Sequence, residues 1–189
     1  MAEIEEAVLR FLKGENEAFD QIVRRWEKMV YSLAWRMLGN REDAQDVVQE
    51  TFLSVYKSAS SLRDPGSFPT WLYQIALNHC RARMRDRAST LTLNASPSSS
   101  SNEEEEFPAI ASPARNGGDA LETIDIIRKA LAGLSEDHRT AIVLKEYLGL
   151  SLEELASVMD CPLSTAKSRL YHGLRGVQRN LKRMGVKVP

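Results

Sequence analysis

Basic and hydrogen-bonding side chains near the C-terminus are the groups in this sequence best suited to chemistry. From Asp160 onward the chain carries seven basic residues, and Asp160 is its one acid. A solvated helix face usually mixes charges of both signs, whereas a face of one sign indicates a polyanionic partner. At helical spacing one side gathers hydroxyl, aromatic and cationic groups, namely Ser164, Ser168, Tyr171, His172, Arg175 and Arg179, with Lys167 and Arg169 on its shoulders. The pattern favours DNA binding over its alternative, a helical hairpin with an ordinary solvated face.

The elements that must hold these groups are predicted to form a helix-turn-helix. Ser151 and Glu154 make a capping box, which begins a helix. The Asp-Cys-Pro run at 160–162 ends it, because proline cannot continue a helix and disfavours helical geometry in the residue before it. A second helix is expected to open near Ser164 or Thr165, both good capping residues. Its apolar side consists of Ala166, Leu170, Leu174, Val177 and Leu181. Two helices, a tight turn and a basic outer face are typical of this motif.

No catalytic or metal-binding constellation is visible in the sequence. Two cysteines, Cys80 and Cys161, and three scattered histidines predict neither a disulfide framework nor a zinc site, although His79 and Cys80 are adjacent. No nucleophile–base pair or phosphate-cradling glycine loop appears, so we expect no enzyme, no metal and no cofactor. The chain has no apolar run of the roughly 20 residues that span a bilayer and no visible signal peptide. These features predict a cytoplasmic protein without membrane insertion.

Helical patterns also dominate the first part of the chain. The first long helix is predicted to begin near Glu15 and to end at Gly39, which suits a C-terminal cap, while Asn40 suits the N-cap of the next helix. After a turn at 63–66, Ser67 is predicted to cap a third helix. No stretch alternates with a period of two, so no sheet is expected. The predicted fold class is all-α, with two small helical bundles joined by a flexible linker and the helix-turn-helix in the second bundle.

Composition sets the expected domain boundaries. Residues 1–87 carry thirteen basic and thirteen acidic side chains, and residues 119–189 carry eleven and nine. Residues 88–118 are rich in Ser, Pro, Asn and Glu, so they cannot bury enough apolar surface to offset the entropy of ordering them. We therefore predict a first domain over 1–87, a flexible linker over 88–118 and a helix-turn-helix domain over 119–189.

Three segments, in this order, resemble the bacterial RNA polymerase sigma factors of the extracytoplasmic-function (ECF) group. Residues 43–58, DAQDVVQETFLSVYKS, are similar to the helix of that family that binds core polymerase. Residues 68–87, FPTWLYQIALNHCRARMRDR, look like the segment that melts DNA and reads the minus-ten element. Residues 150–178 resemble the helix-turn-helix that reads the minus-thirty-five element. The resemblance covers nearly the whole chain outside the linker. It implies a subunit that binds core RNA polymerase and directs promoter recognition, DNA melting and transcription initiation.

The resemblance implies that an acidic and polar helix face binds polymerase. Its residues here are Asp43, Asp46, Gln49 and Glu50. Such a face suits a basic partner surface, which adds specificity and speeds association. Without the resemblance, a merely solvated helix face would be the favoured interpretation.

The resemblance further implies that the third helix binds melted promoter DNA. Asn78 matches the position that reads a flipped minus-ten base in this family. Arg81, Arg83, Arg85 and Arg87 suit the DNA backbone, although many relatives have a mixed polar sequence there. Trp71 and Tyr73 are aromatic, but the periodic position of Trp71 favours the core.

Duplex promoter DNA is the implied ligand of the last helix, which should lie in the major groove. The residues matching the contact segment of the family are Ser164, Thr165, Lys167, Ser168 and Arg169, followed by His172 and Arg175 on the outer face. Relatives commonly have glycine at the position of Ser164, so the turn has a different capping residue here. Lys167 is placed to contact either a base or a phosphate.

Family membership would also imply an anti-sigma factor that masks both domains. The linker acids Glu103 to Glu106 either imitate nucleic acid in a basic channel of polymerase or only solubilise the linker. One rival function is a stand-alone helix-turn-helix regulator that binds duplex operator DNA without polymerase. Another is a helical nucleic-acid-processing enzyme, which would need carboxylates converging on a metal.

Overall fold

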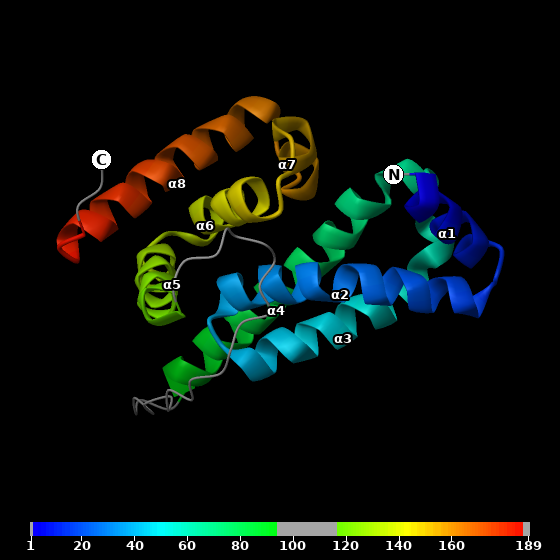
Figure 1. Cartoon of the computed structure of the whole chain (residues 1–189), viewed down its shortest axis with the longest axis horizontal. Coiled ribbons are helices and arrows are strands. Elements are labelled where there is room, and N and C mark those ends of the chain that lie inside the picture. The colour runs from blue at the N-terminus through cyan, green and yellow to red at the C-terminus, as the bar shows by residue number, and fades with distance from the viewer. Residues whose placement is uncertain (1, 94–116, 187–189) are drawn as a thin grey trace.

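The fold of the computed structural model is entirely helical across the residues that the structure describes, 2–93 and 117–186. The N-terminal half contains α1 (Ala2–Leu12), α2 (Asn16–Leu38), α3 (Arg41–Ser58), the short turns η1 (Ala59–Ser61) and η2 (Pro65–Ser67), and α4 (Phe68–Leu93). The C-terminal half contains α5 (Gly117–Ala132), α6 (Glu136–Ile142), the π-helical turn η3 (Val143–Tyr147), α7 (Leu152–Val158) and α8 (Leu163–Arg183). These ranges, with no strand among them, confirm the predicted fold class (Figure 1).

The junction between α2 and α3 forms as the sequence predicted. Gly39 adopts the left-handed backbone conformation, with φ of 66°, that glycine tolerates better than other residues. The Asn40 side chain then caps α3 by accepting a hydrogen bond of 2.9 Å from the backbone N–H of Asp43. This local chemistry turns the chain sharply, so α3 packs back against α2.

The core of the N-terminal half comes from the apolar stripes of α2, α3 and α4. The side chains that are almost fully buried include Ile22, Val30, Leu33, Met37, Val47, Val55, Phe68, Leu72 and Leu77. The helix α1 covers one end of this bundle by burying Val8 and Phe11, whose ring lies 4.9 Å from that of Phe19. A separate helix over residues 2–12 was not predicted from the sequence.

The start of α4 differs from the prediction that Ser67 caps it. Asp64 caps the one-turn helix η2 that precedes α4: its carboxylate accepts hydrogen bonds from the Ser67 hydroxyl (2.7 Å) and from the backbone N–H of Gly66 (3.1 Å). These bonds lower the pKa of Asp64. Ser67 therefore ends the one-turn helix η2, and α4 follows from Phe68 without a break. The Ser67 hydroxyl donates to Asp64, so the capping bonds here are those at the start of η2.

The C-terminal end of α4 and the N-terminal end of α5 both extend into the predicted linker at 88–118. The helix α4 continues to Leu93, and α5 begins at Gly117. Residues 94–116, which include Glu103 to Glu106, lie outside the described residues.

The helix-turn-helix is formed by α7 and α8. The predicted capping box is confirmed: Ser151 Oγ accepts from the backbone N–H of Glu154 (3.1 Å), whose carboxylate accepts from the backbone N–H of Ser151 (2.7 Å). Asp160 occupies the turn with a positive φ of 49°, a conformation that aspartate tolerates better than most residues. The second helix, α8, opens near Ser164 as predicted, at Leu163, but neither Ser164 nor Thr165 is its capping residue. Pro162 precedes α8 directly, with a φ of −57° that leads the chain into the helix at Leu163.

The two halves pack against each other along a seam formed by α2 and α4 on one side and by α5, α6, η3 and α7 on the other (Figure 1). Arg139 donates a hydrogen bond of 2.7 Å to the carbonyl oxygen of Met37. The Arg36 guanidinium stacks over the Tyr147 ring, 4.1 Å from its centroid. The seam was not predicted, because the sequence analysis treated the bundles as separate bodies joined only by the linker.

Candidate nucleic-acid interface and partner-binding face

The outer face of α8 presents most of the predicted duplex-binding residues to solvent. The exposed members are Ser164, Lys167, Ser168, His172 and Arg175, while Thr165 and Arg169 are half-buried. Arg175 stacks over the ring of Tyr171, at 5.7 Å from its centroid. The structure therefore brings these predicted residues together on one helix.

Two glycines position α8 against α6. Gly173 and Gly176 are buried, and a Cβ atom on Gly173 would lie 2.9 Å from the carbonyl oxygen of His138. The helices therefore approach each other more closely than side chains would allow. The glycines form the packing side here, so Leu174, which was predicted to lie on the apolar side of the helix, is 44% exposed. Hydrophobic periodicity carries no signal for a face built from glycine.

Arg169, a predicted duplex-binding residue, is paired with a carboxylate of the protein itself. Its guanidinium lies 2.7 Å from a carboxylate oxygen of Asp137, at the start of α6. This ion pair fixes the side chain beside the outer face of α8. It also means that Arg169 must exchange a carboxylate for any phosphate or base that it binds.

The residues of α4 that were predicted to bind melted promoter DNA fall into three groups. Asn78 and Arg85 are exposed. Arg81 reaches across the seam, where its Nε lies 2.8 Å from Glu136 Oε1. Arg83 turns toward α3 instead. The four arginines of this helix therefore do not share one surface, as a purely DNA-facing row would.

The aromatic residues of α4 pack inside the N-terminal half. Tyr73 is 3% exposed, and its ring lies 5.8 Å from that of Trp26. Burial raises the pKa of the Tyr73 hydroxyl. Trp71 is half-buried and packs against the core, in agreement with its periodic position. Both aromatic rings stabilise the bundle from which Asn78 projects.

The acidic face of α3, which consists of Asp43, Asp46, Gln49 and Glu50, lies beside α4. Arg83 is 2.5 Å from Glu50 and 3.1 Å from Asp46, and Arg87 pairs with Asp43. The side chains of Asp46 and Glu50 remain 51% and 40% exposed, whereas that of Asp43 is only 19% exposed.

Arg83 and His79 of α4 both contact Glu50 on this acidic face. The hydrogen bond from Arg83 to Glu50 raises the pKa of the Arg83 guanidinium. His79 Nδ1 lies 3.3 Å from a Glu50 oxygen, and His79 Nε2 is 2.9 Å from Ser54 Oγ. Sequence reasoning missed Arg83, Arg87 and His79 as partners of the acidic face. The sequence shows that both segments have helical periodicity. It does not give the relative rotation of α3 and α4, which decides whether these side chains meet.

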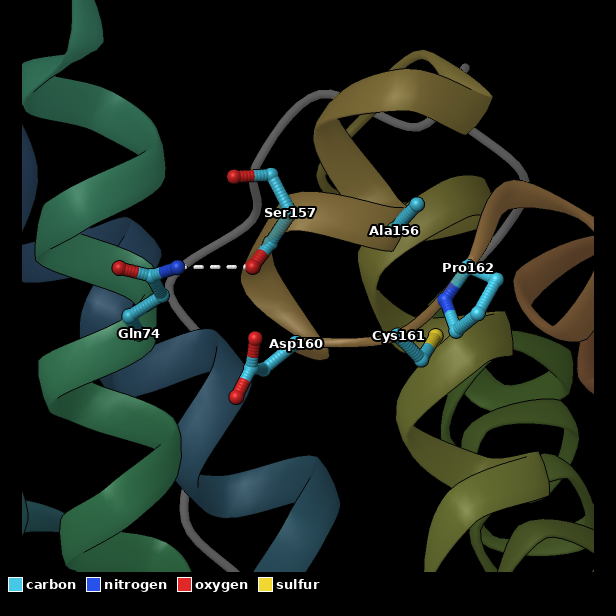
Figure 2. Close-up of a pocket in the computed structure, with 6 residues that line it drawn as sticks. All are labelled: Gln74, Ala156, Ser157, Asp160, Cys161 and Pro162. Carbon is cyan, nitrogen blue, oxygen red and sulfur yellow. Dashed lines mark hydrogen bonds between the residues drawn. The ribbon is translucent and has the colours of Figure 1, made fainter.

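A shallow polar pocket opens where α4 meets the turn of the helix-turn-helix (Figure 2). The Gln74 amide donates a hydrogen bond of 2.7 Å across it to the carbonyl oxygen of Ser157. Cys161 lies half-buried at its edge, and Cys80 is buried in the bundle, where burial raises the thiol pKa to about 12. Within the described ranges, no group of three His, Cys, Asp or Glu side chains could hold a metal ion, and none of the helices there combines the length and the hydropathy of a membrane span.

Comparison with known protein families agrees with this geometry. The family model for sigma-70 region 2 matches residues 22–90, which include α3 and most of α4. The model for sigma-70 region 4 matches residues 124–175, which include α7 and the first part of α8. The chain therefore belongs to the sigma-70 family of RNA polymerase sigma factors, which are transcription initiation factors rather than catalysts.

Curated relatives narrow the assignment to the ECF group. The chain is 33% identical over 178 residues to the ECF RNA polymerase sigma-E factor of Escherichia coli, covering 93% of this chain and 92% of that protein. It is 32% identical over 183 residues to the RNA polymerase sigma-H factor of Pseudomonas aeruginosa, covering 94% and 93%. These relatives confirm the predicted family and do not favour the stand-alone regulator.

Solved structures share the arrangement of the helices. The sigma factor RpoE of Bartonella quintana, in complex with the anti-sigma factor NepR, matches with a TM-score of 0.71 and 25% identity, over 87% of this chain and 96% of that chain. CnrH in complex with the cytosolic domain of CnrY matches with a TM-score of 0.70 over 95% and 97% of the two chains. At 22% identity, CnrH shows the common fold only.

Proposed function

We propose that this sigma factor contacts core RNA polymerase through the acidic face of α3 and reads promoter DNA with α4 and α8. The observation that carries the proposal is the order of its two family regions. A region that contains an acidic face and an exposed base-reading amide precedes a helix-turn-helix with a basic outer face. The protein selects and opens promoters, and the polymerase supplies the chemistry.

Duplex recognition belongs to α8 in this proposal. The exposed Lys167 and Ser168 stand near the N-terminal end of the helix, the part that approaches base edges when such a helix lies in the major groove. Arg175 lies two turns farther along and suits the phosphate backbone. Lys167 contacts either a base edge or a phosphate, and these contacts differ in their sequence dependence.

Recognition of the melted strand belongs to Asn78 on α4. Its exposed amide offers both a donor and an acceptor, which can pair with a base edge only after the base has left the stack. Arg85, which is also exposed, suits the backbone of the separated strand.

Polymerase binding belongs to Asp46, Gln49 and Glu50. Gln49 is exposed, and both carboxylates keep two-fifths or more of their side chains accessible beside Arg83. A basic partner surface would compete with Arg83 for these carboxylates. Because each new ion pair replaces an existing one, the exchange contributes more to the specificity of binding than to its affinity.

The remaining predicted properties are part of the same proposal. The protein acts in the cytoplasm, where bacterial polymerase works, and has no catalytic centre of its own. An anti-sigma factor is its expected inhibitor, because the similar sigma factor of Bartonella quintana forms such a complex.

We also propose a first domain over 1–87, a linker over 88–118 and a second domain over 119–189. The composition of the linker predicts that dilute protease cuts within it, while α2–α4 and α6–α8 resist. Fragments would be identified by mass spectrometry. Protection of the linker equal to that of the helices would show that the boundaries are misplaced.

One experiment tests the main function without knowledge of the promoter. Bacterial core polymerase is mixed with the protein, the complex is purified by size exclusion, and fragmented genomic DNA is transcribed. Mapping RNA 5′ ends should reveal start sites that appear only when the protein is present. A protein that does not co-elute with polymerase, yet binds duplex DNA by itself, would support the stand-alone regulator instead.

A further inference from the structure

A histidine of α4 contacts the acidic face of α3 beside Arg83. His79 Nδ1 lies 3.3 Å from Oε2 of Glu50, while Arg83 Nη2 lies 2.5 Å from Oε1 of the same carboxylate. The other ring nitrogen, Nε2, is 2.9 Å from Oγ of Ser54, one turn farther along α3. The imidazole is therefore held at both nitrogens, and both oxygens of Glu50 have a partner on α4.

The imidazole remains accessible to water. The His79 side chain is 27% exposed and that of Glu50 is 40% exposed, while Ser54 is half-buried. An imidazole ordinarily titrates between about pH 5 and pH 8, which is the range in which bacterial proteins work. The charge beside Glu50 can therefore change under conditions in which the charges of the carboxylates and arginines do not.

The same geometry suits the neutral and the charged ring. A carboxylate only accepts hydrogen bonds, so the proton of the neutral ring belongs on Nδ1, which faces Glu50, and Nε2 can accept from the Ser54 hydroxyl. In the imidazolium form both nitrogens donate, and the Ser54 oxygen can accept once its hydroxyl has rotated. The hydroxyl can then donate to a carbonyl oxygen of its own helix. Protonation therefore adds a charge without moving the ring.

The surrounding ion pairs make that added charge important. The charged side chains on this side of the two helices are Glu50, Asp46, Asp43 and Lys57 on α3 and Arg83 and Arg87 on α4. The three carboxylates are paired with the two arginines, and Lys57 is exposed two turns beyond Glu50. A charged His79 would add a third cation to the ion-paired group and would cancel the negative charge that remains for a basic partner.

We propose that His79 is a further residue of the polymerase-binding site and that its protonation weakens the binding of core polymerase. The imidazolium competes for Glu50 with the cations of the partner surface and repels them, whereas the neutral ring does neither to the same degree. The inference rests on the proposed function, because it takes Glu50 as a contact to polymerase. The affinity for core polymerase should fall as the pH falls through the range in which imidazole titrates.

The test follows the affinity for purified core polymerase from about pH 8 to about pH 6. Three full-length proteins, each carrying a fluorescent label, are compared by anisotropy: the wild type, His79→Gln, which is uncharged throughout, and His79→Lys, which is charged throughout. Titration of the polymerase itself affects all three equally. Relative to His79→Gln, the wild type should lose about three- to tenfold in affinity at the lower pH. His79→Lys should bind more weakly than His79→Gln at every pH.

A second histidine provides the matched control. His138→Gln removes a half-buried histidine of α6 and should keep the pH dependence of the wild type. The same pH dependence in the wild type and in His79→Gln would overturn the proposal, as would tighter binding by the wild type at the lower pH. Circular dichroism verifies folding at each pH. If His79→Gln does not fold, His79→Asn replaces it under the same criteria.

Failure of this inference is distinguishable from failure of the proposed function. Asp46→Arg with Glu50→Arg, measured in the same assay, tests whether the acidic face binds polymerase at all. If this reversal abolishes binding while the wild type and His79→Gln respond equally to pH, the face is confirmed and only the role of His79 is wrong. If the reversal leaves binding intact, both the assignment of the face and the proposal for His79 are overturned.

Discussion

The acidic face of α3 and the basic outer face of α8 satisfy their charges in different ways. The acidic face lies against α4, where Arg83 and Arg87 provide cations to Asp43, Asp46 and Glu50. The outer face of α8 leaves Lys167 exposed, and Arg175 leans on a tyrosine ring. One face is therefore neutralised within the protein, while the other is arranged for a charge from outside.

This difference separates two modes of binding. A partner of α3 must replace arginines that are already hydrogen-bonded, so its affinity depends on close geometry. A partner of α8 gains from releasing counterions, so its affinity depends on salt. Polymerase binding through α3 should accordingly be specific, and duplex binding through α8 should be strongly ionic.

The largest effect is expected from reversing the charge of the acidic face. Asp46→Arg with Glu50→Arg should weaken association with core polymerase by about 100-fold or more, because two charge-assisted contacts become repulsive. A pull-down with purified core polymerase measures the change. Reversal of Glu17 and Asp20, which are exposed on α2, is the matched control. Wild-type binding by the α3 variant, with a normal circular dichroism spectrum, would refute the assignment of this face.

The basic face can be tested one residue at a time. Lys167→Ala should weaken binding to the minus-thirty-five duplex by about 1–3 kcal/mol if its contact is to a base. If Lys167 meets only phosphate, the loss should be uniform across sequences, and the salt dependence should become shallower. Arg169→Ala should cost less, since the wild-type side chain must first leave Asp137. Fluorescence anisotropy at several salt concentrations measures both, and a larger loss for Arg169 would contradict this order.

Asn78 provides a contrast between melted and duplex DNA. Asn78→Ala should leave duplex binding by α8 unchanged but should reduce open-complex formation about tenfold and relax base preference in the minus-ten element. Permanganate footprinting reports melting, and duplex binding is measured in parallel. If the variant melts the promoter like the wild type, with unaltered base preference, α4 is not the strand-reading helix.

The smallest effect is expected at the two buried glycines that position α8, the helix that carries the basic face. Gly173→Ala should lower the free energy of unfolding by about 1–2 kcal/mol, because its Cβ would press on the backbone oxygen of His138. Gly176→Ala should cost less, since the atom that its Cβ meets is the end of the Leu134 side chain, which can move. Urea unfolding followed by circular dichroism measures both. Equal losses would show that the two contacts are equally rigid.

Local chemistry in the sequence predicted local structure well. The capping box at Ser151 and Glu154 and the turn at Gly39 and Asn40 depend on residues a few positions apart, so their bonds can be inferred directly. The start of α8 was predicted to within a residue of Ser164, but its capping residue was not, because two capping hydroxyls were weighed above Pro162. Leu174 belongs to the predicted apolar side yet is exposed, because glycines, which carry no hydrophobic signal, form part of the true packing side.

The candidate site was predicted as a set of residues but not as an arrangement. Periodicity identified which helix faces carry charge, and the structure places Lys167, Ser168 and Asn78 in the open as expected. Periodicity could not show that Arg83 turns toward α3 or that Arg81 crosses the seam. Those contacts depend on the rotation of α4 and on the docking of the two halves, which are decided by packing between distant segments.

Arg139 links the folding of the two halves. Its guanidinium donates to the carbonyl oxygens of Leu131, Ala132 and Leu134 at the end of α5, and across the seam to that of Met37. It is held in partly buried surroundings, which lower its pKa. If α5 frayed, the guanidinium would lose the partners that fix it, and the end of α2 would lose its donor. Such shared partners make free energies non-additive, so the two halves, packed along the seam, should unfold as one cooperative unit despite the long stretch of chain between them.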